Sequence, residues 1–129
     1  MDASRTDPVA IDCDVILVTG DREWNDVDVM MREFEHIPIT CTVVHGGARG
    51  ADTMAGAIAE AMGMVVVVVP AQWSVYGKRA GPIRNRLMYD TYQPNIVYAF
   101  HKHIDSSKGT KDMITYAKKN GCSVRLIEK

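Results

Sequence analysis

The sequence predicts an α/β fold in which helices cover both faces of a five-stranded parallel sheet. Five short apolar runs alternate with four helical patterns along the chain, which is the order of a parallel sheet joined by right-handed crossovers. The apolar runs are rich in β-branched residues and lack polar alternation, as in strands buried on both faces. With 129 residues, the chain has the length of one domain with a full core.

The chain begins with a segment that carries no structural pattern. Residues 1–13 are polar, contain Pro8 and show no sustained period, so we expect a flexible N-terminal arm. Residues 14–129 then form the single domain.

The first strand, helix and second strand follow the arm. Residues 14–19 form an apolar run that ends at Gly20, as expected for a buried strand. Helical spacing predicts a helix over 24–36, which Pro38 ends, with Trp24, Val27, Met30, Met31 and Phe34 on its apolar face. Residues 40–45 are the second strand.

The second helix has the most regular pattern of the chain. Its apolar stripe consists of Ala51, Met54, Ala55, Ile58, Ala59 and Met62, and Gly63 is placed to end it. Residues 64–69 contain five consecutive valines and predict a third buried strand.

A long connection separates the third strand from the third helix. Residues 70–81 are rich in glycine and aromatic residues, and loops of this length are often functional. Pro82 suits the first position of a helix that extends to about residue 92 and buries Ile83, Leu87 and Thr91. Residues 95–100 predict the fourth strand.

The last helix and strand complete the alternation. After a polar loop at 101–109, Thr110 can cap a helix with Met113, Ile114 and Ala117 inward, and Gly121 follows its end. Residues 123–127 predict the last strand.

Composition excludes several classes of protein. A formal net charge of −1 argues against non-specific coating of nucleic acid. Cys13, Cys41 and Cys122 are odd in number and lack metal-site spacing, so we expect thiols in a reducing compartment. The longest apolar run, at 64–71, is too short for a membrane span, and the N-terminus lacks an export signal. We therefore expect a cytoplasmic protein.

Cationic side chains gather after the strands, at the edge of the predicted sheet where ligands of such folds bind. Nine of the fifteen Lys and Arg residues lie in these loops or first helical turns: Arg22, Arg49, Lys78, Arg79, Arg84, Arg86, Lys102, Lys108 and Lys111. A cationic edge on a nearly neutral body suits a small phosphorylated ligand better than a long polyanion.

The most distinctive stretch, residues 45–52, reads HGGARGAD. Glycines let amide N–H groups point into one concavity, and the following helix adds its positive dipole end, which together predict a phosphate cradle. The alternative is a tight turn whose glycines serve packing only. Arg49 between the glycines favours binding.

Other stretches add possible contacts. Arg22 can bind a phosphate or carboxylate, unless it pairs with an acid while Asp21 caps the first helix. Trp73 and Tyr76 can stack on a base, or can simply cover the core. Asn85 can bind a planar edge or a ribose.

The start of the last helix and the remaining titratable residues give weaker signals. Gly109 and Thr110 form a second possible phosphate cradle. His101 and His103 lack a third ligand of suitable spacing, so we expect no metal. Asp52 and Asp112 lie in first helical turns, where dipole complementarity explains an acid without catalysis.

Taken together, the motifs resemble a known family. VTGxRxW at 18–24, HGGARGAD at 45–52, PAxWxxYGKxAGPxRN at 70–85, AF at 99–100 and GTxDM at 109–113 occur in the order seen in the YspA, cpYpsA-related SLOG family. This family, once catalogued as DUF2493, is common in bacteria and bacteriophages. The match covers about residues 14–127.

The resemblance implies a Rossmann-like three-layer α/β/α sandwich with a mainly parallel five-stranded sheet, and a pocket for a nucleotide or nucleotide-derived metabolite. Its motif positions imply ligand contacts at Gly20, Arg22, Gly46, Gly47, Arg49, Gly50, Lys78, Arg84, Asn85, Gly109 and Thr110. From the same stretches we add Trp24, Ala48, Asp52, Trp73 and Tyr76 to the expected ligand-binding set.

More distant relatives suggest two alternatives. The LOG phosphoribohydrolases cleave the N-glycosidic bond of nucleoside monophosphates with a PGGxGTxxE motif. Here both leading glycines are missing and Met113 replaces the glutamate, which leaves Asp52, Asp112 and Arg84 as catalytic candidates. DprA proteins share the turn at 46–52 and bind single-stranded DNA.

The leading hypothesis is a module that binds a nucleotide-type small molecule, such as an ADP-ribose, NAD or nucleoside-phosphate derivative, as a sensor or processing domain. No other cofactor is implied. We also expect a homodimer or larger homo-oligomer, through the face of Met30, Met31 and Phe34 or through the stripe on the second helix.

Overall fold

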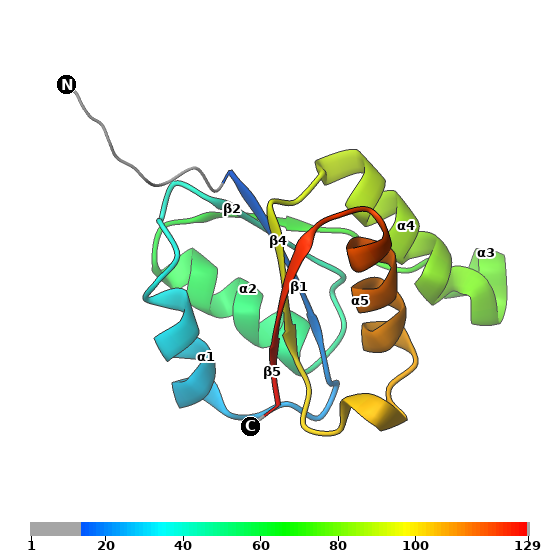
Figure 1. The fold of residues 1–129 in the computed structure, drawn as a ribbon, viewed down its shortest axis with the longest axis horizontal. Helices are drawn as coiled ribbons and strands as arrows, with labels where there is room; N and C mark the ends of the chain where they lie inside the picture. Colours follow the sequence, from blue (N-terminus) through cyan, green and yellow to red (C-terminus); the bar gives the residue numbers. More distant parts are fainter. Residues whose placement is uncertain (1–13, 129) are drawn as a thin grey trace.

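The computed structural model describes residues 14–128, and the predicted arm at 1–13, with Cys13, lies outside them. A five-stranded, all-parallel sheet forms the middle layer, with strand order β3-β2-β1-β4-β5. Helices cover both of its faces, so the predicted three-layer α/β/α sandwich is confirmed (Figure 1).

The central strand is β1 (Val15–Gly20), which pairs with β2 (Thr42–His45) on one side and β4 (Ile96–Phe100) on the other. Ile16, Leu17 and Val18 are fully buried, as the continuous apolar run predicts. β5 (Ser123–Ile127) pairs with β4 at one edge.

Each face of the sheet has its own core. α1 (Val27–Phe34) and α2 (Ala51–Ala61) pack on one face through residues such as Phe34 and Ala55. α4 (Ala80–Tyr92) and α5 (Gly109–Lys119) pack on the other through Met88 and Met113 (Figure 1). The alanine stripe of α2 lets this helix approach the sheet closely, and Gly63 follows its end with φ +84°.

The third strand differs from the prediction of burial. β3 (Val65–Val68) lies at an edge of the sheet, and Val65 and Val68 are 63% and 51% exposed. An apolar run indicates a strand but does not specify its neighbours, so it carries no signal of the edge position.

The first helix is shorter than predicted. Asp26 caps it, because its side chain accepts a hydrogen bond from the amide of Val29, and Asp21 therefore does not serve as the cap. Trp24 precedes the helix, which ends at Phe34.

The connection predicted as a loop contains α3 (Trp73–Tyr76) and the 3₁₀ turn η2 (Gly77–Arg79). α4 starts at Ala80, so Pro82 is its third residue and not its first.

The buried face of α4 was also predicted wrongly. It consists of Ala80, Asn85, Met88 and Tyr89, whereas Leu87 is 56% exposed, Thr91 is exposed and Ile83 is only partly buried. Asn85 forms polar contacts with α5, described below, and a search for apolar spacing cannot detect a polar residue on the buried face.

The residue that caps α5 also differs from the prediction. After η3 (Ile104–Ser106), the hydroxyl of Ser107 accepts hydrogen bonds from the amides of Thr110 and Lys111. Ser107 thus provides the cap assigned to Thr110, which is buried in the first turn. Met113, Ile114 and Ala117 face inward as predicted.

Among residues 14–128, no helix combines the length and apolarity that a membrane span requires. Cys41 is buried and Cys122 is partly buried.

Candidate ligand-binding cleft

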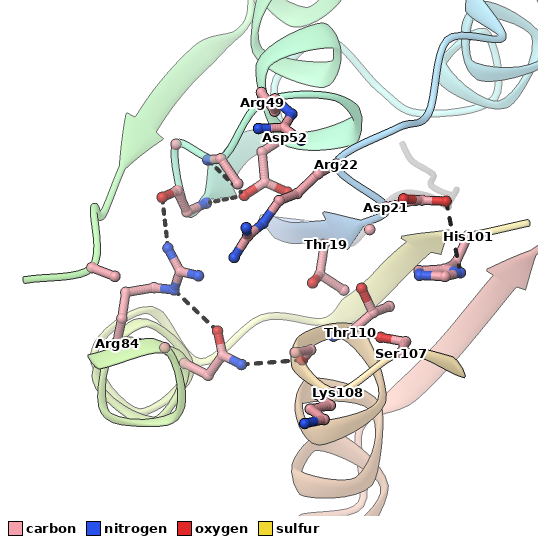
Figure 2. Close-up of a pocket in the computed structure, with 18 of the residues that line it drawn as sticks. Thr19, Asp21, Arg22, Arg49, Asp52, Arg84, His101, Ser107, Lys108 and Thr110 are labelled. Carbon is pink, nitrogen blue, oxygen red and sulfur yellow. Dashed lines mark hydrogen bonds and ion pairs between the residues drawn. The ribbon is translucent and has the colours of Figure 1, made fainter. Parts of the chain in front are cut away.

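A cleft of about 900 Å³ opens at the carboxyl ends of the strands. It lies where the strand order reverses between β1 and β4, the position at which doubly wound sheets bind ligands. From the predicted ligand-binding set, the residues that line it are Gly20, Arg22, Gly46, Gly47, Ala48, Arg49, Asp52, Trp73, Arg84, Asn85, Gly109 and Thr110. Motif loops far apart in the sequence thus meet around one space (Figure 2).

The backbone amides of the loop after β2 donate hydrogen bonds to neighbouring side chains. The amide N–H groups of Gly46 and Ala48 donate to one carboxylate oxygen of Asp52, Oδ2, at 3.0 and 3.3 Å. The amide of Gly47 donates to Nδ1 of His45 at 3.0 Å. These three donors were predicted to receive a phosphate, but they already have acceptors within the loop. These three amides are therefore not available to an anion, and the cationic side chains of the cleft are the remaining donors.

Asp52 is the buried acid of the cleft. Burial raises its pKa from 3.8 to about 6, and the amides of Ala48 and Gly46 and the charge of Arg84 only partly oppose this rise. Its position in the first turn of α2 also favours negative charge. Asp52 thus holds the loop through two hydrogen bonds and lines the cleft, in addition to placing a negative charge near the N-terminus of α2.

Arg84 reaches across from α4 to the same loop. Its Nη1 donates to the carbonyl of Gly46 at 2.6 Å and to that of Val69 at 3.3 Å, and its Nε donates to Oδ1 of Asn85 at 3.1 Å. A Cβ on Gly46 would overlap the guanidinium, so this contact requires glycine at position 46. No residue of 14–128 accepts a hydrogen bond from Nη2, which keeps two N–H donors for a ligand.

Arg22 supplies a second cation. It is exposed, forms no ion pair or hydrogen bond with residues 14–128, and its side chain extends over the cleft (Figure 2). Burial lowers the pKa of Arg84, Asp52 opposes this effect, and the positive charge of Arg22 lowers that pKa further. The two guanidinium groups therefore repel each other across the cleft.

Gly50 fixes the loop that carries Arg22. Its φ is +79°, and a Cβ there would overlap the backbone of Asp21 and Arg22. The amide of Ala51 also donates to the carbonyl of Asp21 at 3.0 Å. Gly50 thus supports the cleft from outside and does not line it.

The rim and the far wall complete the charge pattern. Arg49 pairs with Glu23 at 2.7 Å, and both side chains are largely exposed. Lys108 and Thr110 line the wall at the start of α5, where Thr110 is buried. No residue of 14–128 pairs with Lys108.

His101 is a lining residue that sequence reasoning assigned no ligand. Its Nδ1 accepts a hydrogen bond from the amide of His103 at 3.0 Å. Oδ2 of Asp21 lies 4.0 Å from the same nitrogen. Within residues 14–128, no three His, Cys, Asp or Glu side chains lie close enough together to hold a metal ion.

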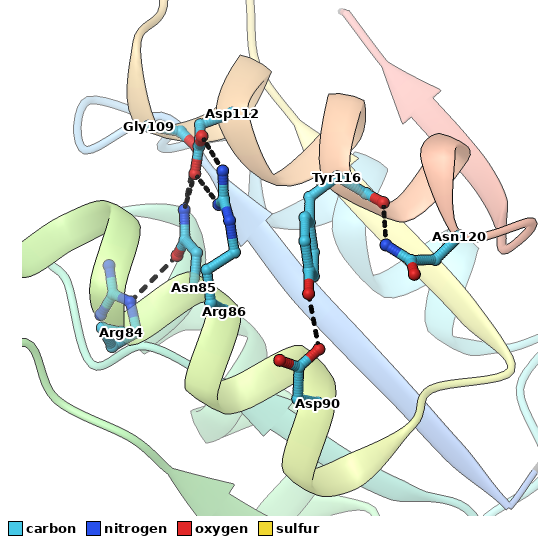
Figure 3. A network of polar contacts seen from close by, with 8 residues as sticks. All are labelled: Arg84, Asn85, Arg86, Asp90, Gly109, Asp112, Tyr116 and Asn120. Carbon is cyan, nitrogen blue, oxygen red and sulfur yellow. Dashed lines mark hydrogen bonds and ion pairs between the residues drawn. The ribbon is translucent and has the colours of Figure 1, made fainter.

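Asn85 and Asp112 connect α4 to α5 (Figure 3). Nδ2 of Asn85 donates to Asp112 at 3.1 Å and to the carbonyl of Gly109 at 3.3 Å, while Arg86 forms two bonds with Asp112 at 2.8 and 3.0 Å. Burial alone would raise the pKa of Asp112, but the bonds from Arg86 and Asn85 outweigh it and lower the pKa. Asp112 lies outside the cleft lining and acts as a helix-to-helix tie, which removes it as a candidate acid or base.

Three more predicted ligand residues lie outside the cleft. Trp24 is buried, packs edge-to-face on Phe100 with ring centroids 5.5 Å apart, and belongs to the core. Tyr76 and Lys78 lie beyond the cleft on α3 and η2, exposed to solvent. Their positions in a motif-rich stretch gave no information on which way the turns face.

Lys108 was expected at this edge as one of the cationic residues, but sequence reasoning missed other lining residues, namely Thr19, Asp21, Glu23, Pro70, Ala71, Gly81, His101 and Ser107. Thr19 lies near the end of β1, and the others lie in the segments between a strand and the next helix that packs on the sheet, or in the first turn of that helix. This placement was the one available signal, since their residue types are common in loops.

The sheet order and the cleft at its switch point define the class of this protein as a Rossmann-like α/β domain. The model of the YspA, cpYpsA-related SLOG family (YAcAr) matches residues 14–76. The Gene 61 protein of Mycobacterium phage D29 is 34% identical over an alignment of 118 residues, and the match covers 84% of this chain and 92% of that protein. The chain therefore belongs to the YspA, cpYpsA-related SLOG family.

A solved structure shares the fold. The X-ray structure of DNA processing protein A (DprA) from Streptococcus pneumoniae aligns with a TM-score of 0.73 and 17% identity, over 88% of this chain and 50% of DprA. The chain thus spans about half the length of DprA.

Proposed function

We propose that this domain binds a nucleotide or nucleotide-derived small molecule in the cleft at the β1/β4 switch point, as a sensor or processing module. The observation that carries the proposal is the pair of guanidinium groups of Arg22 and Arg84, which face the same space and repel each other. A phosphate between them would turn this repulsion into two charge-assisted contacts.

The surroundings of the two arginines support a phosphorylated ligand of moderate size. Lys108 and the start of α5 add positive potential on the opposite wall. Trp73, at the rim and half exposed, offers a flat apolar face for a base. The volume of about 900 Å³ lies within the range of small-molecule and cofactor sites.

Calorimetric titration with AMP, ADP-ribose and NAD tests the proposal. We expect at least one of them to bind and Arg22→Ala to weaken it by about tenfold or more, because a hydrogen bond to a charged group contributes about 1.5–3 kcal/mol. Arg32→Ala, which removes an exposed arginine of α1 outside the cleft, is the matched control and should bind like the wild type. If none of the three compounds gave a measurable heat of binding, the proposal would be contradicted.

A second candidate is hydrolysis of the N-glycosidic bond of a nucleoside phosphate. Asp52 favours it, because a carboxyl group in the cleft with a pKa of about 6 is suited to proton transfer near neutral pH. Chromatography after long incubation at high protein concentration would detect the free base. Its absence, with binding intact, would leave a binding module.

Single-stranded DNA binding is the third candidate, for which the fold shared with DprA gives only general support. It predicts retention of oligonucleotides that falls steeply with salt and weakens in Arg49→Ala. Salt-independent retention would exclude it.

A further inference from the structure

Asp52 offers the cleft a hydrogen-bond acceptor in addition to its structural contacts. We propose that its second carboxylate oxygen, Oδ1, accepts a hydrogen bond from a sugar hydroxyl, so that the site selects ribose phosphates over their deoxy counterparts. This inference rests on the proposed function and names the part of the ligand that the site distinguishes.

The two oxygens of Asp52 have different surroundings. Oδ2 accepts both loop amides, whereas Oδ1 accepts no hydrogen bond from residues 14–128. In Figure 2 the bonded oxygen faces the loop, and the other points away from it toward the side of the cleft where Arg22 lies. The residue is only 5% exposed. A buried carboxylate oxygen needs a donor, and on the open side a ligand can supply one.

Electrostatic repulsion decides which part of the ligand can lie beside Asp52. A carboxylate repels a phosphate, so the anionic part belongs beside Arg22 and Arg84 and not beside Oδ1. The group next to Asp52 must therefore be a neutral donor. Arg84 and Asp52 both bond to Gly46, Arg84 to its carbonyl at 2.6 Å and Asp52 to its amide at 3.0 Å, so the cation and the acid are near neighbours.

Because Arg84 and Asp52 are near neighbours, a sugar hydroxyl is favoured over a base amino group as the donor to Oδ1. In a nucleoside phosphate the ribose hydroxyls lie a few bonds from the phosphate, whereas the exocyclic amine of the base is much farther away. A ligand with its phosphate at Arg84 can thus present a ribose hydroxyl to Oδ1, and the base is left to point toward the rim at Trp73.

Asp52→Asn separates this role from that of holding the loop. The amide oxygen of asparagine can accept both loop amides, so its NH₂ group takes the place of Oδ1. The loop keeps its hydrogen bonds, while the group that faces the ligand changes from an acceptor to a donor and loses its negative charge. A purely structural role predicts little change in selectivity.

The experiment compares calorimetric affinities for AMP, 2′,3′-dideoxy-AMP and inorganic pyrophosphate. The wild type should bind AMP about tenfold or more tightly than dideoxy-AMP, because a hydrogen bond to a charged group is lost. Asp52→Asn should bring these two affinities close together and should bind pyrophosphate at least as tightly as the wild type. Glu60→Gln, which removes an exposed carboxylate of α2 outside the cleft, should keep the preference for AMP.

Each outcome decides between the two proposals. Equal wild-type affinities for AMP and dideoxy-AMP would overturn the hydroxyl contact and leave the proposed function standing. An unchanged preference in a folded Asp52→Asn variant, checked by circular dichroism, would also overturn it. Binding of none of the three compounds would overturn both.

Discussion

Asp52→Asn should make the protein more stable at neutral pH, although it alters the cleft. The folded state raises the pKa of Asp52 from 3.8 to about 6, so folding favours the protonated acid. The stability that this proton provides is fully present below pH 3.8 and is lost as the pH rises through about 6. Each pKa unit corresponds to about 1.4 kcal/mol, so ionised Asp52 costs up to about 3 kcal/mol above pH 7.

Asparagine does not ionise and therefore carries no such cost, and its side-chain oxygen can accept hydrogen bonds from the same two amides. The attraction of Arg84 for the carboxylate is already included in the pKa, so its loss is not an additional cost. We therefore expect the free energy of unfolding to rise by up to about 3 kcal/mol at pH 7–8, and by little near pH 4.

Urea unfolding followed by circular dichroism at pH 4, 5, 6, 7 and 8 measures this difference. Asp112→Asn is the matched control, because the bonds from Arg86 and Asn85 lower the pKa of Asp112. Its stabilising effect is present above the unfolded pKa and is lost as the pH falls, so this variant should be less stable at pH 7 by about 1 kcal/mol. A neutral or destabilising effect of Asp52→Asn at pH 8, with the control behaving as expected, would refute the reasoning.

Three further predictions concern glycines and assembly. Gly46→Ala should displace the guanidinium of Arg84 and weaken nucleotide binding about as much as Arg84→Ala, and the double variant measured by calorimetry should be no worse than either alone. Gly56→Ala should lower the free energy of unfolding in urea by about 1–3 kcal/mol, because a Cβ would lie 2.6 Å from Nε2 of buried His45, although alanine normally favours a helix; no loss would refute this. The homo-oligomer stays a prediction that light scattering checks: Met30 and Phe34 are fully buried, so the predicted apolar face of α1 retains mainly Met31, and a monomer mass would contradict assembly.

The fold was predictable because periodicity and strand–helix alternation depend on local sequence. Runs such as 14–19 and the alanine stripe of α2 specify their structure without information about neighbours. The edge position of β3 and the rotation of α4 depend on partners far away in sequence, and for that reason they were missed. Leu87 has the residue type of a core position, yet it is exposed, and polar Asn85 lies on the buried side of the helix with Met88 and Tyr89.

The cleft was predictable as a place, and less so in its chemistry. Parallel strands bring the loops that follow their carboxyl ends to one edge, so Arg22, Gly46 and Arg84 were expected together. The sequence could not show that Asp52 takes up the amides of Gly46 and Ala48, because a residue in a first helical turn has several possible partners. The sequence also could not show that the ring of Trp24 packs against Phe100, because a position within a motif does not reveal whether its side chain is buried.

The contact beneath Gly50 has a consequence for anyone who wishes to transplant or diversify this cleft. The backbone at residues 21–22 rests directly on this glycine, and the amide of Ala51 donates to the carbonyl of Asp21. A length change in either the β1 or the β2 loop would therefore shift the other loop, and Arg22 with it. The two loops form one unit that must be moved or randomised together, whereas Val75 and Tyr76 of α3, which are exposed and lie outside the cleft, can be varied on their own.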